Sequence, residues 1–371
     1  MKLAYYITPH GFGHAVRSLE VIRHLRAMRR DLEITLVSDL PEFLVTQNAG
    51  PVPTRKRVLD VGLKQLDSVR YDLGATLAAI GELRAGQERI QGEEKDFLER
   101  NRIGGIVCDV PFLPLRPANE VGIPAVCLGN FTWDWIYRSF AGNDPRWTEL
   151  ADWITGEYGF ADSFLRLPFH GGGDCFQMVE DVPMIARRAV HGRDEIRNML
   201  GIGDGVKACL LGFKDLNLPP ESLSRIATIP DTVFLFKKPL KYTFTNGLCV
   251  DSLDVPYMDF VAAVDGVITK PGYGIVTDCI ANDAPMIYCD RGEFPEYPIL
   301  VEAIEKYLTS VFMPSSELYA GNWKPYLERL ESARPEYEKG SARAKGSVPR
   351  PPVNGAEVCA RRILDFMDRG Q

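Results

Sequence analysis

Residues 5–14 read YYITPHGFGH, an apolar strand that runs into a glycine loop, with a histidine where the next helix begins. Gly11 and Gly13 let backbone N–H groups approach a ligand closely, and the following helix adds its positive end. A histidine at this position, His14, has the chemistry to bind a phosphate or to accept a proton. The stretch therefore predicts a strand–loop–helix unit with a ligand site at the carboxyl end of the first strand.

Strand and helix signals alternate along the chain in two series. In the first series we expect strands at 3–8, 33–38, 105–108, 125–128 and 163–167, and helices at 14–29, 73–100 and 147–158. The second series follows a crossing segment at 180–192, and its expected strands are 207–212, 232–236, 266–269, 285–289 and 310–313. Such alternation is typical of right-handed βαβ units and parallel sheets.

The expected fold class is therefore α/β, with two Rossmann-like parallel-sheet domains facing across a cleft. A length of 371 residues suits two domains better than one core. We predict a first domain over residues 1–185 and a second over 186–353, the latter ending in a surface connection at 342–353. Residues 354–371 are predicted to form a C-terminal helix that returns to the first domain.

Composition excludes several classes of protein. Apolar content of 45% and charged content of 25% are ordinary for a globular chain, and a net charge of −7 argues against a nucleic-acid partner. The eight cysteines are scattered without a C-x-x-C pair, which predicts reduced thiols and a cytoplasmic location. The histidines show no spacing relative to them that suits zinc.

Hydropathy predicts neither a membrane span nor a signal peptide. No apolar run approaches about 18 residues, the length that a spanning helix needs. The chain opens directly on a strand, without the apolar run of a secretory signal. Arginines 23, 26, 29 and 30 are interpreted as a solvated helix face, with a peripheral contact to anionic lipid as the alternative.

Two residues of the first domain are candidates for acid–base chemistry. Asp109 ends the apolar strand 105–108, at the edge of the sheet where sites form. If its carboxylate reaches His14, it would hold the imidazole tautomer and stabilise the imidazolium. The alternatives are that each residue merely caps a local turn or helix. A dinucleotide site is less favoured, because the G-x-G of residues 11–13 lacks the third glycine of that fingerprint.

A second glycine loop, KPGYGIVTD at residues 270–278, follows the strand 266–269. Backbone N–H groups, the helix dipole and Lys270 all favour a diphosphate there. Asp278 lies one turn into the helix, where its carboxylate could accept from ribose hydroxyls. The alternative is a tight turn with an acid that stabilises the helix. The residues of this loop that we expect to bind a nucleotide-diphosphate donor are Lys270, Gly272, Tyr273, Gly274, Thr277 and Asp278.

Two further loops follow predicted strands. The acids Asp290, Glu293 and Glu296 suit sugar hydroxyls, although acids near a solvated helix start explain them equally well. The other loop could cover the molecule that accepts a sugar, through Asn130, Trp133 and Asp134. Alternatively, these three side chains could pack in the interior. The sequence contains no Asp-x-Asp metal clamp and no G-x-x-x-x-G-K-[ST] loop. We therefore expect no metal and no cofactor, with lysine, arginine and helix dipoles meeting the phosphate charge.

Taken together, these motifs resemble those of GT-B glycosyltransferases. The chain resembles the family of the lipid II-forming N-acetylglucosaminyltransferase and, more closely, the glycosyltransferase-like N-terminal domain of plant L-arabinokinases. The similarity is carried by the opening glycine loop, residues 130–134, the crossing segment 181–188, the loop at 272–278 and residues 354–358.

The resemblance implies an acceptor-side first domain and a second domain that holds a nucleotide-diphosphate sugar, with a UDP-sugar as the expected donor. Asp278 stands where the family usually places a glutamate on the ribose. Lys214 stands in a loop, 211–215, that lacks the family's glycines, and it is expected to bind the donor phosphate in their place. Gly11 and Gly13 are also expected to contact the donor. The implied activity is inverting, metal-independent sugar transfer to an acceptor hydroxyl, and no glycine-serine loop of a sugar kinase is present. The alternatives are a nucleotide-sugar 2-epimerase and a non-catalytic nucleotide-sugar-binding module.

Overall fold

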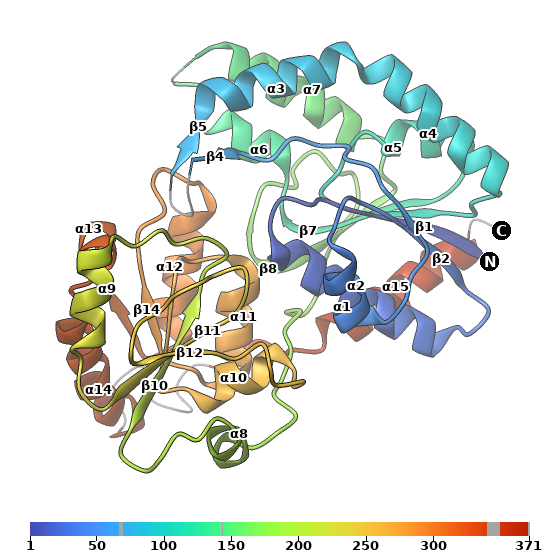
Figure 1. Ribbon diagram of the computed structural model, residues 1–371. Coiled ribbons are helices and arrows are strands. Elements are labelled where there is room, and N and C mark those ends of the chain that lie inside the picture. Colours follow the sequence, from blue (N-terminus) through green and yellow to red (C-terminus); the bar gives the residue numbers. More distant parts are fainter. Residues whose placement is uncertain (67–69, 143, 340–348, 370–371) are drawn as a thin grey trace. The chain divides into compact units, whose positions relative to one another are not determined.

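The computed structural model describes residues 1–66, 70–142, 144–339 and 349–369, which belong to two compact units (Figure 1). The first unit contains Met1–Lys64, Asp72–Ala186 and Pro352–Gln371. The second contains Gln65–Tyr71 and Arg187–Pro351. The first unit is thus built from three separate stretches of the chain.

The first unit is built on a parallel sheet of seven strands. Their order across the sheet is β3 (Thr54–Arg55), β2 (Glu33–Val37), β1 (Lys2–Ile7), β6 (Ile106–Asp109), β7 (Ala125–Phe131), β8 (Ser163–Gly171) and β9 (Val179–Asp181). The central strands β1, β6 and β7 are almost wholly buried, as expected for a parallel sheet covered on both faces.

Helices lie on both sides of this sheet (Figure 1). They are α1 (Phe12–Met28), α2 (Glu42–Ala49), α3 (Leu73–Ala85), α4 (Gln87–Asn101), α5 (Leu115–Glu120), α6 (Trp133–Arg138), α7 (Arg146–Tyr158) and α15 (Gly355–Arg369). Helix α15 packs against α1, as predicted for the C-terminal helix. Part of the basic face of α1 is used within the unit, because Arg29 pairs with Asp368 of α15 and Arg26 donates to the carbonyl of Ala49.

The second unit holds a six-stranded parallel sheet. Its order is β12 (Gly247–Cys249), β11 (Thr232–Phe236), β10 (Lys207–Gly212), β13 (Gly266–Thr269), β14 (Met286–Tyr288) and β15 (Ser310–Phe312). Its helices are α8 (Arg193–Met199), α9 (Pro220–Ala227), α10 (Tyr257–Ala263), α11 (Tyr273–Asn282), α12 (Glu296–Tyr307), α13 (Ser315–Ala320) and α14 (Lys324–Lys339). A hydrophobic core joins residues of the strands, helices and loops, among them Phe234, Ile287 and Trp323. A separate two-stranded sheet joins β4 (Lys64–Gln65) to β5 (Tyr71–Asp72).

Strand register sets which loops meet. Ile7 pairs with Asp109, so the loop after β1 and the end of β6 lie at the same edge of the first sheet. In the second sheet, Thr269 pairs with both Gly212 and Tyr288, and this brings the ends of β10, β13 and β14 level. Both predicted glycine loops therefore leave their sheets at the carboxyl edge, where neighbouring loops converge.

The α/β class is confirmed, and several element boundaries differ from those predicted. The expected helix at 73–100 is two helices, α3 and α4, separated at Gly86, since glycine favours helix interruption. Strand β8 continues past the predicted end at 167 to Gly171. The short strands β3, β9 and β12 were not predicted, because two or three residues carry no readable periodicity. Of the predicted connection at 342–353, residues 342–348 lie outside the described residues.

Candidate functional site

The structure brings His14 and Asp109 together. His14 Nδ1 lies 2.9 Å from Asp109 Oδ1, and the Asp109 side chain is fully buried while 12% of the His14 side chain is exposed. An ionised carboxylate only accepts hydrogen bonds, so this contact favours a proton on Nδ1, and Arg17 Nη2 also lies 2.9 Å from that nitrogen. The Nε2 atom, with no partner among the described residues, is then the basic nitrogen of the ring. This is the geometry of an imidazole general base with a carboxylate that orients it.

Two residues that sequence reasoning missed, Arg17 and Ser18, complete the surroundings of Asp109. Arg17 donates through Nε to Oδ2 at 2.8 Å and through Nη2 to Oδ1 at 2.6 Å. Ser18 Oγ donates to Oδ2 at 2.5 Å. Arg17 also donates to Asn130 Oδ1 at 2.6 Å, which gives the predicted acceptor residue Asn130 a buried place behind the carboxylate. The signal in the sequence is an arginine and a serine on the otherwise apolar face of α1.

Charge balance around Asp109 keeps it ionised. Burial by itself raises the pKa of Asp109, but the charge and hydrogen bonds of Arg17, and then those of His14, outweigh burial. The pKa of this carboxyl is therefore held well below its usual range. A carboxylate that stays ionised is what His14 needs beside it if its ring is to carry a positive charge during a reaction.

Backbone geometry positions both members of the pair. Gly11 has a φ of 112° at the start of α1, a conformation that a residue with a Cβ rarely adopts. Val110, directly after Asp109, has a φ of 81°, which is strained for a β-branched residue. Its carbonyl accepts from the buried Tyr158 hydroxyl at 2.7 Å. Surrounding contacts thus hold a strained turn at the end of β6, next to the candidate site.

The aromatic segment after β7 belongs to the interior of the first unit. Trp133 is 3% exposed, stacks on Tyr137 and donates through Nε1 to Asp60 Oδ2 at 2.8 Å. Asp134 is buried and accepts from the Thr155 hydroxyl at 3.0 Å. Burial leaves no face of the Trp133 ring for a sugar. Interior packing, the alternative given above, describes Trp133 and Asp134 better than contact with an acceptor does.

In the second unit, the loop 270–274 leads from β13 into α11. Helix α11 has no acidic residue in its first turn and no side-chain cap on its N-terminus, so its positive end is not satisfied by either. Gly272 faces open space, whereas Tyr273 is buried. Gly274 lies in the first turn, where its carbonyl accepts from the buried Thr277 hydroxyl at 3.0 Å. Lys270, at the end of β13, is half-buried.

Asp278 contacts the chain where it enters the second unit. Its Oδ1 accepts from the Arg187 backbone N–H at 3.0 Å, and its Oδ2 accepts from the Arg187 guanidinium at 2.9 Å. The Asp278 residue is 5% exposed. The observed role is structural, and contact with a ribose remains a prediction for this residue.

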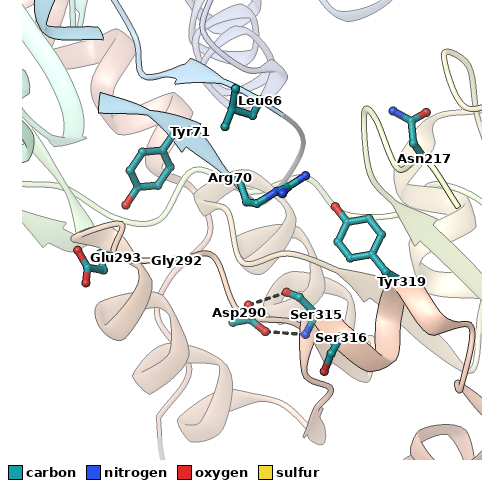
Figure 2. Close-up of a pocket in the computed structure, with 10 residues that line it drawn as sticks. All are labelled: Leu66, Arg70, Tyr71, Asn217, Asp290, Gly292, Glu293, Ser315, Ser316 and Tyr319. Atoms are coloured by element: carbon teal, nitrogen blue, oxygen red, sulfur yellow. Dashed lines mark hydrogen bonds between the residues drawn. The ribbon is translucent and has the colours of Figure 1, made fainter. Parts of the chain in front are cut away.

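The acids after β14 divide into two paired residues and one exposed one. Asp290 accepts from the Ser315 hydroxyl and backbone N–H, both at 2.6 Å (Figure 2). Glu296 pairs with Arg291 at 3.0 Å. Glu293 is exposed and lies near Tyr71; burial first, and then the Glu293 charge, raise the pKa of the Tyr71 hydroxyl.

Asp290 and Glu293 border a cavity of about 730 Å³ in the second unit. Figure 2 shows the ten residues that line it: Leu66, Arg70, Tyr71, Asn217, Asp290, Gly292, Glu293, Ser315, Ser316 and Tyr319. Its lining is rich in hydroxyl and carboxylate groups, which suits a polyhydroxylated ligand. Lys214 lines a second cavity of about 570 Å³, together with Lys241 and Tyr242.

The described residues contain neither a metal-type cluster nor a membrane-spanning helix. No group of three or more His, Cys, Asp or Glu side chains within the described ranges is arranged to hold a metal ion. Of the helices that the structure describes, none has the length and apolar character needed to cross a bilayer.

Comparisons with known proteins agree with the two-sheet architecture. The calicheamicin glycosyltransferase CalG4 superimposes with a TM-score of 0.62 at 15% identity, over 99% of this chain and 98% of that one. A UDP-glucosyltransferase from Polygonum tinctorium gives 0.60 at 12% identity, over 99% and 98% of the two chains. The chain has the GT-B fold.

Sequence comparison identifies a relative of this GT-B chain. It is 32% identical to the L-arabinokinase of Arabidopsis thaliana over 383 aligned residues, which cover 98% of this chain and 34% of that protein. The chain therefore spans about a third of the length of the curated relative that it matches. No family model matches the sequence. The predicted resemblance to plant L-arabinokinases is confirmed.

Proposed function

We propose that this GT-B chain is a glycosyltransferase that moves a sugar from a nucleotide-diphosphate donor, a UDP-sugar, to an acceptor hydroxyl. The observation that carries the proposal is His14, whose Nδ1 is held 2.9 Å from the buried Asp109 carboxylate. Support comes from the glycosyltransferases of the same fold and from the open N-terminus of α11. The cytoplasmic location, and the absence of a metal requirement, are part of the same proposal.

In the proposed reaction, His14 Nε2 removes the proton of the acceptor hydroxyl as its oxygen attacks the anomeric carbon. A new carbon–oxygen bond forms on one face of the sugar, and the bond to the diphosphate oxygen breaks on the other, with inversion. The electron pair of that bond leaves with the diphosphate. Lys270 and the backbone N–H groups at Gly272–Gly274 stabilise the departing charge, a contribution worth a few kcal/mol for each donor.

The donor sugar would occupy the 730 Å³ cavity, with hydroxyls facing Glu293, Ser316 and Tyr319. A thermal-shift screen against UDP-, GDP-, dTDP- and ADP-sugars identifies the donor first, because any ligand that prefers the native state raises its melting temperature. Transfer is then followed as release of the free nucleotide diphosphate in the presence of candidate acceptors.

His14→Ala tests the assignment of the base. Turnover should fall by about 10²–10⁴, while the thermal shift produced by the donor should persist. His24→Ala is the control, since His24 lies on the same helix and its partner is the half-buried Glu20. Undiminished turnover in His14→Ala refutes the base. Donor binding without any turnover in the wild type indicates a binding module, and release of an epimerised sugar without acceptor indicates a 2-epimerase.

A further inference from the structure

A second histidine at the same loop also pairs with a buried carboxylate. His10 immediately precedes Gly11, and its Nε2 lies 3.2 Å from the Asp60 carbonyl oxygen and 3.5 Å from Asp60 Oδ1. The Asp60 side chain is fully buried, whereas 31% of the His10 side chain is exposed. Among the described residues, His10 Nδ1 has no hydrogen-bond partner. One edge of the ring is therefore anchored and the other is available to a ligand.

The loop that carries Asp60 is fastened to the interior. Trp133 Nε1 donates to Asp60 Oδ2 at 2.8 Å, and the Tyr137 hydroxyl donates to the Val61 carbonyl. Gly62 lies so close to the imidazole that an added Cβ would come within 2.4 Å of His10 Cγ. The ring is thus held on an edge by Asp60 and on a face by Gly62, which gives it a fixed orientation.

Charge balance makes His10 the cationic partner of Asp60. A buried carboxylate requires a counter-charge or a full set of hydrogen bonds. No lysine or arginine among the described residues forms an ion pair with Asp60, and its neutral donor is the Trp133 indole. Burial lowers the pKa of His10, but the hydrogen bonds and charge of Asp60 outweigh both burial and the nearby Lys64, and they raise the pKa above its ordinary value.

Two aromatic rings connect His10 to the candidate base His14. The rings of His14 and Phe131 are 5.3 Å apart, those of Phe131 and Trp133 5.2 Å, and those of Trp133 and His10 6.4 Å. These four rings form a continuous series in the first unit, with the two histidines at its ends. His10 and His14 also flank the same glycine loop, so we expect one acceptor molecule to contact both.

We propose that His10 binds the acceptor, with Nε2–H held by Asp60 and Nδ1–H donating to an anionic oxygen of a carboxylate or phosphate group. The acceptor would then be an acidic molecule. This inference rests on the proposed function and specifies its acceptor. Hydrogen bonds between ionised partners are about twice as strong as neutral ones, so a cationic donor favours an anionic oxygen over a plain hydroxyl.

The test is nitrogen NMR on the full chain with ¹⁵N-labelled histidine, using inorganic phosphate and acetate as probes and chloride as the ionic-strength control. We expect both ring nitrogens of His10 to be protonated at pH 7, and phosphate or acetate to shift the Nδ1 resonance. A response to phosphate alone indicates a phosphorylated acceptor, and a response to acetate alone indicates a carboxylate. A neutral His10 at pH 7, or no response beyond that of chloride, overturns the proposal.

Variants separate binding from structure. His10→Gln should weaken the probe that binds by roughly ten- to a hundredfold, as expected for one lost hydrogen bond to a charged group. His24→Gln is the matched control, because His24 is also near a carboxylate, with Nε2 3.4 Å from Glu20, and should leave probe affinity unchanged. If His10→Gln is too unstable, Gly62→Ala displaces the ring without removing it and should weaken the probe as well. Unchanged affinity in whichever variant folds refutes the role. Because probe binding needs no turnover, this result is independent of the His14→Ala assay.

Discussion

Replacing Arg17 with methionine should destabilise the first unit strongly. Arg17 is 3% exposed and Asp109 is fully buried, so solvent screens their contact very little. The substitution removes two hydrogen bonds to Asp109, at 2.8 and 2.6 Å, and one to Asn130 at 2.6 Å. Removing one partner of a buried ion pair costs about 3–5 kcal/mol in free energy of unfolding, and we expect Arg17→Met to fall in that range at pH 7.

The pH dependence of this loss has a definite sign. In the wild type, the pKa of Asp109 is lowered, so its contribution is present above the unfolded value of about 3.9 and disappears as the pH falls toward the folded value. Without Arg17, burial raises the pKa of Asp109, and the buried charge destabilises the fold until it is protonated. The difference in stability between the wild type and Arg17→Met should therefore be larger at pH 7 than at pH 4.

Urea unfolding followed by tryptophan fluorescence measures this difference, because four of the five tryptophans (residues 133, 135, 147 and 153) lie in the first unit. Arg23→Met is the matched control on the same helix. Arg23 is 55% exposed and pairs with Glu20 three residues away, a contact worth about 0.2–1 kcal/mol. A cost for Arg17→Met no greater than that for Arg23→Met, or an equal cost at pH 7 and pH 4, would refute the stabilising role of Arg17.

Two further predictions concern packing and thiol reactivity. In Gly355→Ala the new Cβ would lie 2.1 Å from the Pro183 carbonyl oxygen, so the free energy of unfolding should fall by about 1–3 kcal/mol in the same assay. Gly156→Ala is the control, because Gly156 has open space around it and the substitution should not destabilise the protein. Equal stabilities of the two variants would contradict this prediction. Cys249 is exposed and Cys175 half-buried, whereas the other six cysteines are buried, and burial raises the pKa of the Cys175 thiol to about 12. A thiol-specific reagent at pH 8 should therefore modify Cys249 rapidly in the native protein and all eight cysteines after unfolding; rapid labelling of Cys108 or Cys127 would contradict the packing.

Local pattern was enough to predict most strands and both glycine loops, since each depends on a contiguous stretch. Contacts between segments far apart in the sequence were harder to predict. The pairing of His14 with Asp109 was a hypothesis at the level of sequence, because only the sheet order, in which β1 lies beside β6, brings them together. The sequence does not reveal which strands will be neighbours across some 100 residues of intervening chain.

The residues that support the site also depend on contacts between distant segments, and they differ in how far the sequence predicts them. Arg17 and Ser18 stand on the buried face of α1, and a charged residue there is a signal that could have been found. Asp60 lies in a loop without regular structure, and nothing local connects it to His10. Trp133 and Asp278 have residue types that suit a ligand, but their burial and partners are set by tertiary packing. Burial of this kind follows from the assembled fold and not from the local pattern.

The return of α15 to the first unit has a consequence for synthesis on the ribosome. Gly355 donates its N–H to the Met184 carbonyl, and Cys359, Ile363 and Met367 of α15 are buried. The second unit is complete once residue 351 has emerged, whereas the first lacks α15 until residues 355–369 have also been made. Although domains generally fold in the order in which they are made, here the unit that begins first is completed after the other. Helix α1 therefore stays without its contact to α15 until that helix has been made.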